Sequence, residues 1–305
     1  MVSAVFHSPS EASDALRADK ASAKSASTPM TAASSALPAT APAQPAKAPF
    51  DWAGWAFKVL SPLAGLALLI GIWALLTMKS TNFPTPLQTW DAAVVLFSDP
   101  FYSNGPNDQG IGWNILFSLK RVAMGFGLAA LVGIPMGFII GRSKVIGGML
   151  NPIISLLRPV SPLAWLPIGL LVFKSADPAA IWTIFICSIW PMIINTAVGV
   201  QRVPEDYLNV AKVLNLSEWK IVTKILFPSV LPYMLTGVRL SVGTAWLVIV
   251  AAEMLTGGVG IGFWVWDEWN NLNVQHIIIA IFVIGIVGLL LENALVAVAK
   301  RFSFE

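Results

Sequence analysis

The sequence predicts an all-α membrane protein with six transmembrane helices and one cytoplasmic helix–turn–helix. The first observation is composition: 56% of the 305 residues are hydrophobic and 11% are charged, whereas a soluble domain carries about 25% charged residues. The mean hydropathy is +0.73. The second observation is a set of six apolar runs. The third is a polar, helix-forming insert at 203–228, between the fourth and fifth runs.

The first 50 residues differ from the rest, because they are rich in Ala, Ser, Thr and Pro. Such a composition cannot build a core. We predict a disordered cytoplasmic tail at 1–50 and a transmembrane domain at 51–305. The tail lacks a basic region followed by an apolar one, so it is not a secretory signal peptide. The single Cys187 rules out a disulfide framework and is predicted to be buried.

A membrane-spanning helix needs roughly 20 apolar residues. Six segments of the chain meet this requirement: 59–78, 122–141, 145–173, 178–201, 231–252 and 277–299. The third contains Arg158 and several prolines, so we expect it to be kinked or broken. Gly133, Gly137 and Gly141 recur every four residues on the second, which predicts close packing against a helix of this chain or of a second copy.

The positions of Lys and Arg predict the orientation. Six spans place both termini on one side of the membrane. With the termini inside, four cations lie near outer ends (Lys79, Lys120, Arg121 and Lys174) and ten near inner ends: Lys47, Lys58, Arg142, Lys144, Arg202, Lys212, Lys220, Lys224, Lys300 and Arg301. Cytoplasmic loops carry the excess of positive charge. Both termini and the insert at 203–228 are therefore predicted to be cytoplasmic.

The insert has the start and stop signals of two short helices. Pro204 suits a first helical turn, and the acids Glu205 and Asp206 follow at the positive end of the helix dipole. Asn215 tolerates the left-handed conformation that ends a helix, and Ser217 can cap the next one. We expect Pro228 and Pro232 to mark a turn into the fifth span.

This segment, VPEDYLNVAKVLNLSEWKIVTKILFPSVLP, resembles the EAA loop of the permease subunits of bacterial ABC importers. That loop reads E-A-A, three residues, Gly, nine residues, Ile, one residue, Leu-Pro. Here Asn replaces Glu, Val replaces the first Ala, Asn replaces Gly and Phe replaces Leu, with the spacing kept. The resemblance implies that a set of residues in this loop couples the chain to an ATPase. They are Asn209, Ala211, Asn215, Glu218, Lys220, Ile225 and Pro228.

The segments SPLAWLPIGL, WPMIINTAVGV, GVRLSVGTAWLVIVAAEML and GIGFWVWDEWN are similar to permeases of the nitrate, sulfonate and bicarbonate importer group. The resemblance covers residues 55–305. It implies the type I ABC importer permease fold, a homodimer in the bacterial inner membrane, two cytoplasmic ATPase subunits and an external substrate-binding protein. The implied cargo is a small anion moved by alternating access: nitrate or nitrite, with bicarbonate, cyanate or a sulfonate as alternatives.

No phosphate-cradling G-x-x-x-x-G-K-[ST] motif occurs in the chain. We therefore expect no enzyme activity, catalytic residue, metal or cofactor in this subunit, with ATP and Mg held by the partner ATPases. The net charge of +3 is too small to argue for nucleic acid. An ion-coupled secondary transporter is a rival, with Glu253 and Glu292 as coupling carboxylates, although no internal repeat is evident. One Cys and two His do not supply the site of a membrane enzyme.

Arg158 and Arg239 lie inside predicted spans, where a charge costs at least about 2.5 kcal/mol. Each either pairs with an acid, Glu253 or Glu292, or attracts the anion in its pathway. We place that pathway at the dimer axis, between the third, fourth and fifth spans. Its predicted hydrogen-bond donors and narrowing side chains are Ser161, Trp165, Thr196, Ser241, Thr244 and Trp246.

Overall fold

The computed structural model describes residues 52–79 and 83–302. The chain divides into two units, Met1–Val59 and Leu60–Glu305. The predicted tail lies outside the described residues, and the described part of the first unit is the beginning of α2 (Trp52–Thr77). Within the described residues of the second unit, the regular structure is helical apart from one bridge between Ser103 and Gln109.

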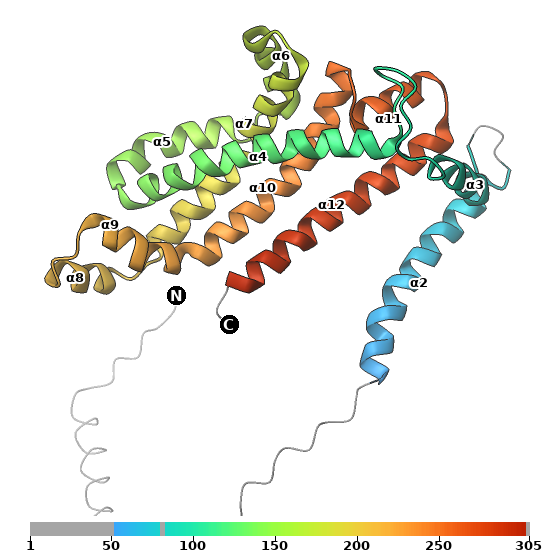
Figure 1. Cartoon of the computed structure of the whole chain (residues 1–305). Coiled ribbons are helices and arrows are strands. Elements are labelled where there is room, and N and C mark those ends of the chain that lie inside the picture. Colours follow the sequence, from blue (N-terminus) through green and yellow to red (C-terminus); the bar gives the residue numbers. More distant parts are fainter. Residues whose placement is uncertain (1–51, 80–82, 303–305) are drawn as a thin grey trace, which may run out of the picture. The chain divides into compact units, whose positions relative to one another are not determined.

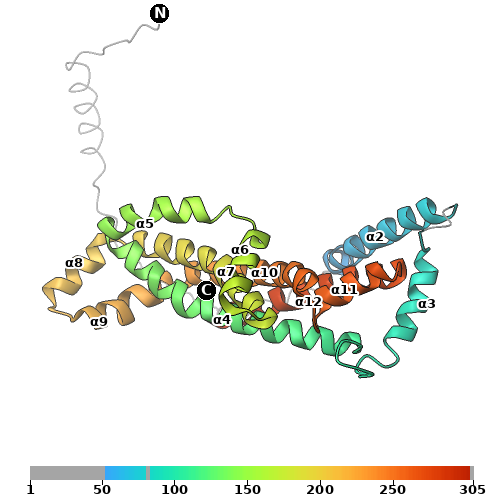
Figure 2. The same ribbon diagram turned by 90° about the horizontal axis from the view of Figure 1, so that it is seen from above.

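The centre of the second unit is α7 (Ala176–Gln201), which lies between α4 (Ile111–Arg142) and α10 (Phe227–Thr256) (Figures 1 and 2). About 61% of the membrane-spanning stretch of α7 is buried, a larger share than in any other candidate span. The other helices of this unit are α3 (Pro86–Leu96), which contacts α12 (Val274–Phe302), and α5 (Lys144–Leu157), α6 (Pro162–Phe173), α8 (Glu205–Val213), α9 (Glu218–Ile221) and α11 (Ile261–Asn270).

Small residues bring α4 and α7 into close contact. A Cβ added to any of four glycines of α4 would lie 2.5–3.1 Å from side-chain atoms of α7: Gly125 against Ile184, Gly133 against Met192, Gly137 against Thr196 and Gly141 against Val200. The predicted glycine face is therefore confirmed, and it packs within the chain. Because the partner numbers rise together with the glycine numbers, the two helices run parallel.

Because α4 and α7 run in the same direction, the chain between them must return from the end of α4 to the start of α7. α5 and α6 make this return, with a bend of 100° at the break between them. Pro159 and Pro162 lie in and just after the break, and a residue before proline avoids the helical conformation. The predicted broken third span is thus confirmed. Counting the pair as one crossing gives the six predicted spans.

The entry to the fifth span differs from the prediction. We expected a turn at Pro228 and Pro232, but α9, a π-helical turn at Val222–Leu226 and α10 follow one another without a break, so the apolar helix runs over Glu218–Thr256. Pro228 has no N–H to donate and lies in the first turn of α10. The wider π turn before it accommodates this missing donor, so the helix continues.

Candidate coupling surface and charged sites

The first helix of the insert ends in a Schellman motif, a specific C-terminal turn. The N–H of Leu216 donates to the carbonyl of Ala211 and that of Asn215 donates to Lys212, both at 3.0 Å. Asn215 itself has φ +48°, in the left-handed region. This is the 6→1 and 5→2 pattern that closes a helix. The prediction that Asn215 takes over the turn geometry of the family glycine is confirmed.

The inner face of the helix–turn–helix packs on the ends of α7 and α10. Ala211, Ile221 and Leu226 are buried there with Val200 and Val230. In addition, the guanidinium of Arg142, at the end of α4, donates to the carboxylate of Glu218. Ser217 is the N-cap of α9 as predicted, although its hydroxyl makes no capping hydrogen bond. The motif is therefore fixed to the helices that it follows and precedes.

The outer face of the same motif carries exposed apolar side chains between its charged residues. Asn209 and Lys220 are exposed beside them, as is Pro228, whereas Ile225 is half-buried. An apolar patch on a polar segment marks an interaction site. We call it the apolar tip; its members, with their exposed fractions, are Tyr207 (56%), Val210 (57%), Val213 (81%), Leu214 (64%) and Trp219 (75%). The family pattern did not single out these residues; their helix face distinguishes them from buried Ala211.

We expect Asn215→Val to lower the stability of the turn by about 1–3 kcal/mol, because a β-branched residue is strained at positive φ. Asn215→Gly should retain wild-type behaviour, since glycine adopts this conformation freely. Limited proteolysis of the purified protein between 205 and 221 measures the difference. Equal cleavage rates for the two variants would contradict the proposed role of the left-handed residue.

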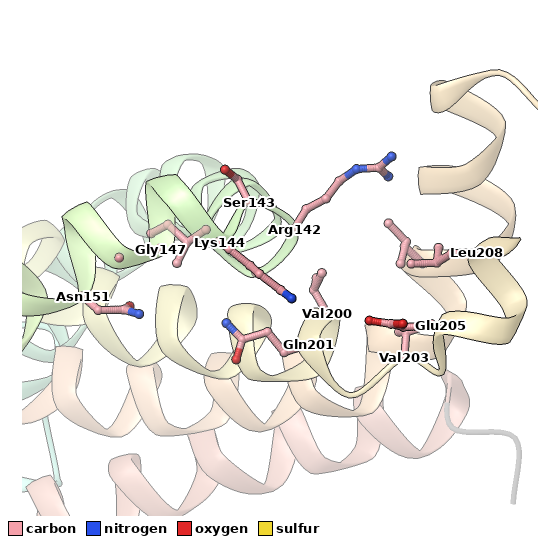
Figure 3. A pocket seen from close by; sticks show the side chains of 14 residues that line it. Arg142, Ser143, Lys144, Gly147, Asn151, Val200, Gln201, Val203, Glu205 and Leu208 are labelled. Atoms are coloured by element: carbon pink, nitrogen blue, oxygen red, sulfur yellow. The ribbon is translucent and has the colours of Figure 1, made fainter. Parts of the chain in front are cut away.

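A cavity of about 450 Å³ lies between the α4–α5 turn, the end of α7 and the start of α8. Figure 3 shows the side chain of Lys144 extending across it, with Asn151, Gln201 and Glu205 around it. Arg142 also lines the cavity but points away, toward the insert. Polar groups of both signs thus surround a space on the predicted cytoplasmic side.

Arg158 follows the last residue of α5, at the break before α6, and is exposed. No hydrogen bond or ion pair is formed by its guanidinium within residues 52–79 and 83–302. It lines a cavity of about 500 Å³ together with Asn151, Ser155 and Ile194. Ser161, the N-cap of α6, is exposed at the other end of the break.

Arg239 has a carboxylate partner in the chain. Its Nε donates to Oε1 of Glu292 at 2.9 Å, which joins α10 to α12. The two side chains are 54% and 46% exposed. Of the two acids that the sequence offered as partners, Glu292 is therefore the one that Arg239 contacts.

The predicted hydroxyl and indole groups occupy different environments. Ser241 is fully buried and donates to the carbonyl of Ser188 at 2.7 Å, and Trp246 donates to the carbonyl of Ile284 at 2.9 Å. Thr244 donates to Leu240 in its own helix. The structure thus places Ser241 and Trp246 in contacts between helices.

Two further residues of that set have polar atoms that are buried without a hydrogen-bond partner in the described part of the chain. They are Thr196 and Trp165. Thr196 is completely buried against Gly137 in the α4–α7 contact, whereas Trp165 is half-buried on α6.

A buried ionic network at the predicted outer end was missed by sequence reasoning. Arg121 donates from Nη1 to Glu253 at 2.7 Å and to the carbonyl of Val259 at 2.6 Å, and its Nε donates to Asp177 at 2.8 Å. The side chain of Glu253 is only 1% exposed. This network, which we call the outer clamp, joins α4, α7 and α10.

The outer clamp also holds the first turn of α11. The backbone N–H of Gly262 donates to Glu253 at 3.0 Å, that of Ile261 to Ser118 at 2.9 Å, and that of Gly260 to Asn114 at 2.9 Å. These are donors that a helix leaves unsatisfied at its start. The carboxylate also lies at the positive end of the helix dipole.

Comparisons with known proteins agree with this architecture. The family model described as the binding-protein-dependent transport system inner membrane component matches residues 133–303. The nitrate import permease protein NrtB of Synechocystis sp. is 49% identical over 237 residues, which cover 77% of this chain and 86% of that protein. NrtB of Leptolyngbya laminosa is 51% identical over 235 residues, with 77% and 84% covered.

The bicarbonate transport system permease protein CmpB of Synechocystis sp. is 44% identical over 249 residues, which cover 80% of this chain and 89% of that protein. Among solved structures, the MetNI methionine ABC transporter in an inward-facing conformation matches with a TM-score of 0.55 at 14% identity. The match covers 62% of this chain and 94% of that one. At this identity the likeness shows the fold alone.

Proposed function

This chain belongs to the family of binding-protein-dependent transport system inner membrane components, and we propose that it forms the anion pathway of an ATP-driven nitrate importer. It is a multi-pass permease subunit with the ABC importer permease fold. The observation that carries the cargo assignment is the identity of 49–51% to two nitrate import permeases. A second candidate cargo is bicarbonate, because a bicarbonate permease is 44% identical.

The apolar tip supports the proposed coupling. We assign it the role of docking surface for a cytoplasmic ATPase subunit, which hydrolyses ATP with Mg on behalf of the importer. Trp219, the member of the tip on α9, is joined to α10 without a flexible joint, because α9, the π turn and α10 are continuous. A push on the tip therefore passes directly into the fifth span, as alternating access requires.

The rest of the proposed assembly follows the family. Two copies of this chain form the pathway in the bacterial inner membrane, with two ATPase subunits on the cytoplasmic side and a substrate-binding protein outside. Both termini lie in the cytoplasm, as the ten inner and four outer cations predict. Within this pathway, Arg158 supplies positive charge, and Ser161 and Trp165 lie near it on the broken span.

Uptake into proteoliposomes tests the cargo. The complex is reconstituted with its ATPase subunits and binding protein, and uptake and ATP hydrolysis are measured with nitrate, nitrite, bicarbonate, cyanate and a sulfonate in turn. We expect nitrate to give coupled uptake at the lowest concentration. A response to bicarbonate alone would transfer the assignment to the second candidate, and uptake without ATP would support a secondary transporter.

Trp219→Ala is expected to weaken ATPase docking by about 2 kcal/mol or more, the effect of removing a central aromatic anchor. Trp219 is 75% exposed in the free subunit, so its loss should leave the fold intact. Co-purification of the ATPase in detergent measures the loss. Trp269→Ala is the matched control, because Trp269 is an exposed tryptophan on α11. Equal ATPase retention in both variants would exclude the tip as the docking site.

A further inference from the structure

One face of α5 is polar over its whole length. At 3.6 residues per turn, five positions fall within about 80° of one another around the helix. These positions, which we call the α5 stripe, are Lys144, Gly148, Asn151, Ser155 and Arg158. From Lys144 to Arg158 the stripe is about 21 Å long at 1.5 Å per residue. This length equals about two-thirds of the thickness of a hydrocarbon core, which is about 30 Å.

The other exposed face of α5 is apolar. It carries Val145, Met149, Ile153 and Leu156, which are 50–72% exposed. A helix surrounded by lipid alone would be apolar on all sides, because a polar stripe at membrane depth must face protein or water. The division between the two faces therefore indicates that the stripe lines an aqueous space.

Two of the cavities in the described part of the chain lie along the stripe. The inner cavity, of about 450 Å³, is lined by Lys144, Gly148 and Asn151. The second, of about 500 Å³, is lined by Asn151, Ser155 and Arg158. Asn151 belongs to both, so the two spaces adjoin one another at its side chain. α7 forms the opposite wall, with Gln201 in the first cavity and Ile194 in the second.

The pairing of the arginines also favours an anion beside the stripe. Arg121 and Arg239, which also lie within spanning helices, are paired with Glu253 and Glu292. Arg158 has no such partner in the described part of the chain. An unpaired cation inside a membrane protein is expensive unless a counter-ion reaches it. An anion moving along the stripe is such a counter-ion.

We propose that the α5 stripe is the cytoplasmic half of the anion route, with Arg158 as its entry, Asn151 and Ser155 as neutral hydrogen-bond donors, and Lys144 as its exit. The ligand is a small, singly charged oxyanion. The proposal rests on the proposed function in taking the cargo to be a small anion, but it replaces the hydroxyls of α10 by the amide of Asn151 and the hydroxyl of Ser155 on α5.

The acids near the exit fit this direction of movement. Glu205 lines the inner cavity opposite Lys144, and Glu218 pairs with Arg142. Arg142 and Lys144 thus each have an acid near them, whereas Arg158 has none within the described residues. The carboxylate of Glu205 therefore weakens the attraction of Lys144 for an anion that reaches the inner cavity.

Thiol labelling tests the stripe without depending on transport rates. Ser155→Cys and Met149→Cys are made in a Cys187→Ala background, because Cys187 is the only cysteine, and the reconstituted complex is treated with a small anionic methanethiosulfonate. We expect Ser155→Cys to react and to be slowed by nitrate. Met149→Cys, on the apolar face, is the control and should react more slowly, with no effect of nitrate.

The outcomes distinguish the role of the stripe from the identity of the transported anion. Protection of Ser155→Cys by bicarbonate or cyanate instead of nitrate would support the stripe and contradict the proposed function. Equal labelling of the two cysteines, or labelling of neither, would overturn the stripe. In uptake assays, Arg158→Gln should raise the half-saturating anion concentration about tenfold to hundredfold, the effect of losing one charge-assisted hydrogen bond. Lys174→Gln, which removes a cation just after α6 and outside the stripe, should leave this concentration unchanged.

Discussion

Glu253→Ala is expected to destabilise the helix bundle by about 3–5 kcal/mol, the effect of removing one partner of a buried ion pair. The carboxylate is 1% exposed. It accepts hydrogen bonds from Arg121, Ser118 and the backbone N–H of Gly262. All three donors are left without this partner in the variant, and the guanidinium remains in a site where its side chain is only 11% exposed.

Asp177 does not compensate for this loss. It accepts from Arg121 at the edge of the clamp, but its side chain is 64% exposed, and exposed ion pairs contribute about 0–1 kcal/mol. Glu253→Gln should be milder than Glu253→Ala, because the amide oxygen still accepts hydrogen bonds. The combination Arg121→Met with Glu253→Met should be less damaging than the sum of the single variants, since no unpaired charge remains.

The pair Arg239–Glu292 supplies the matched control. It also joins two spanning helices, but its side chains are about half exposed. Because both groups are about half exposed, the unpaired guanidinium can turn toward water or the lipid headgroups, so Glu292→Ala should lower stability less than Glu253→Ala. Unfolding of the purified protein, followed by tryptophan fluorescence during denaturant titration, compares the two. Similar midpoints for Glu253→Ala and Glu292→Ala would contradict the role assigned to the outer clamp.

The outer clamp shows what could not be predicted from the sequence. Its members come from α4, α7, α10 and the turn before α11, so no short pattern contains them. Arg121 was read as an outer flanking charge, and Glu253 as a partner for Arg158 or Arg239. Charge and burial identify candidates for pairing, but the choice among three arginines depends on how the helices pack.

The features that were predicted correctly have local causes. Asn215 takes the left-handed conformation because the residue type tolerates it after a helix. The third span breaks where Pro159 and Pro162 interrupt it. The prediction of a turn at Pro228 was wrong, because the adjacent π turn allows the helix to continue through the proline. This π turn depends on the packing of the motif against α7 and α10.

The candidate pathway was predicted only in part. Arg158 stood out because a charge in an apolar run is rare. The hydroxyls of α10 were chosen for residue type alone, and Ser241 is used in a contact with α7. Asn151 and Ser155 were overlooked, although their helical spacing from Arg158 is visible in the sequence. The signal that could have found them is the contrast between the two faces of α5.

Gly137→Leu is expected to prevent the correct packing of α4 on α7 and so to lower the stability of the fold strongly. Even a Cβ at this position would lie 2.5 Å from the Cβ of Thr196 and 2.8 Å from the carbonyl oxygen of Ile193. The second of these atoms belongs to the backbone, so it cannot move without shifting α7. Overpacking a core by a methyl group costs about 1–3 kcal/mol, and a leucine adds three more carbons.

Gly127 is the matched control on the same helix, because an added Cβ there meets nothing within 4 Å. Gly127→Ala should be neutral or stabilising by up to about 1 kcal/mol, since alanine favours the helix over glycine. Gly137→Ala gains the same helix propensity but should still be destabilised. The comparison thus separates the contact with α7 from the effect of the residue on its own helix.

A second substitution on α7 tests the contact directly. Thr196→Gly removes the nearest obstructing atom, and no hydrogen bond of its hydroxyl is lost within the described part of the chain. We expect Thr196→Gly to restore part of the stability lost in Gly137→Ala, and only part, because the carbonyl of Ile193 remains at 2.8 Å. Denaturant midpoints of the two single variants and the double variant measure the coupling. Strictly additive effects would show that α4 and α7 do not meet at this position.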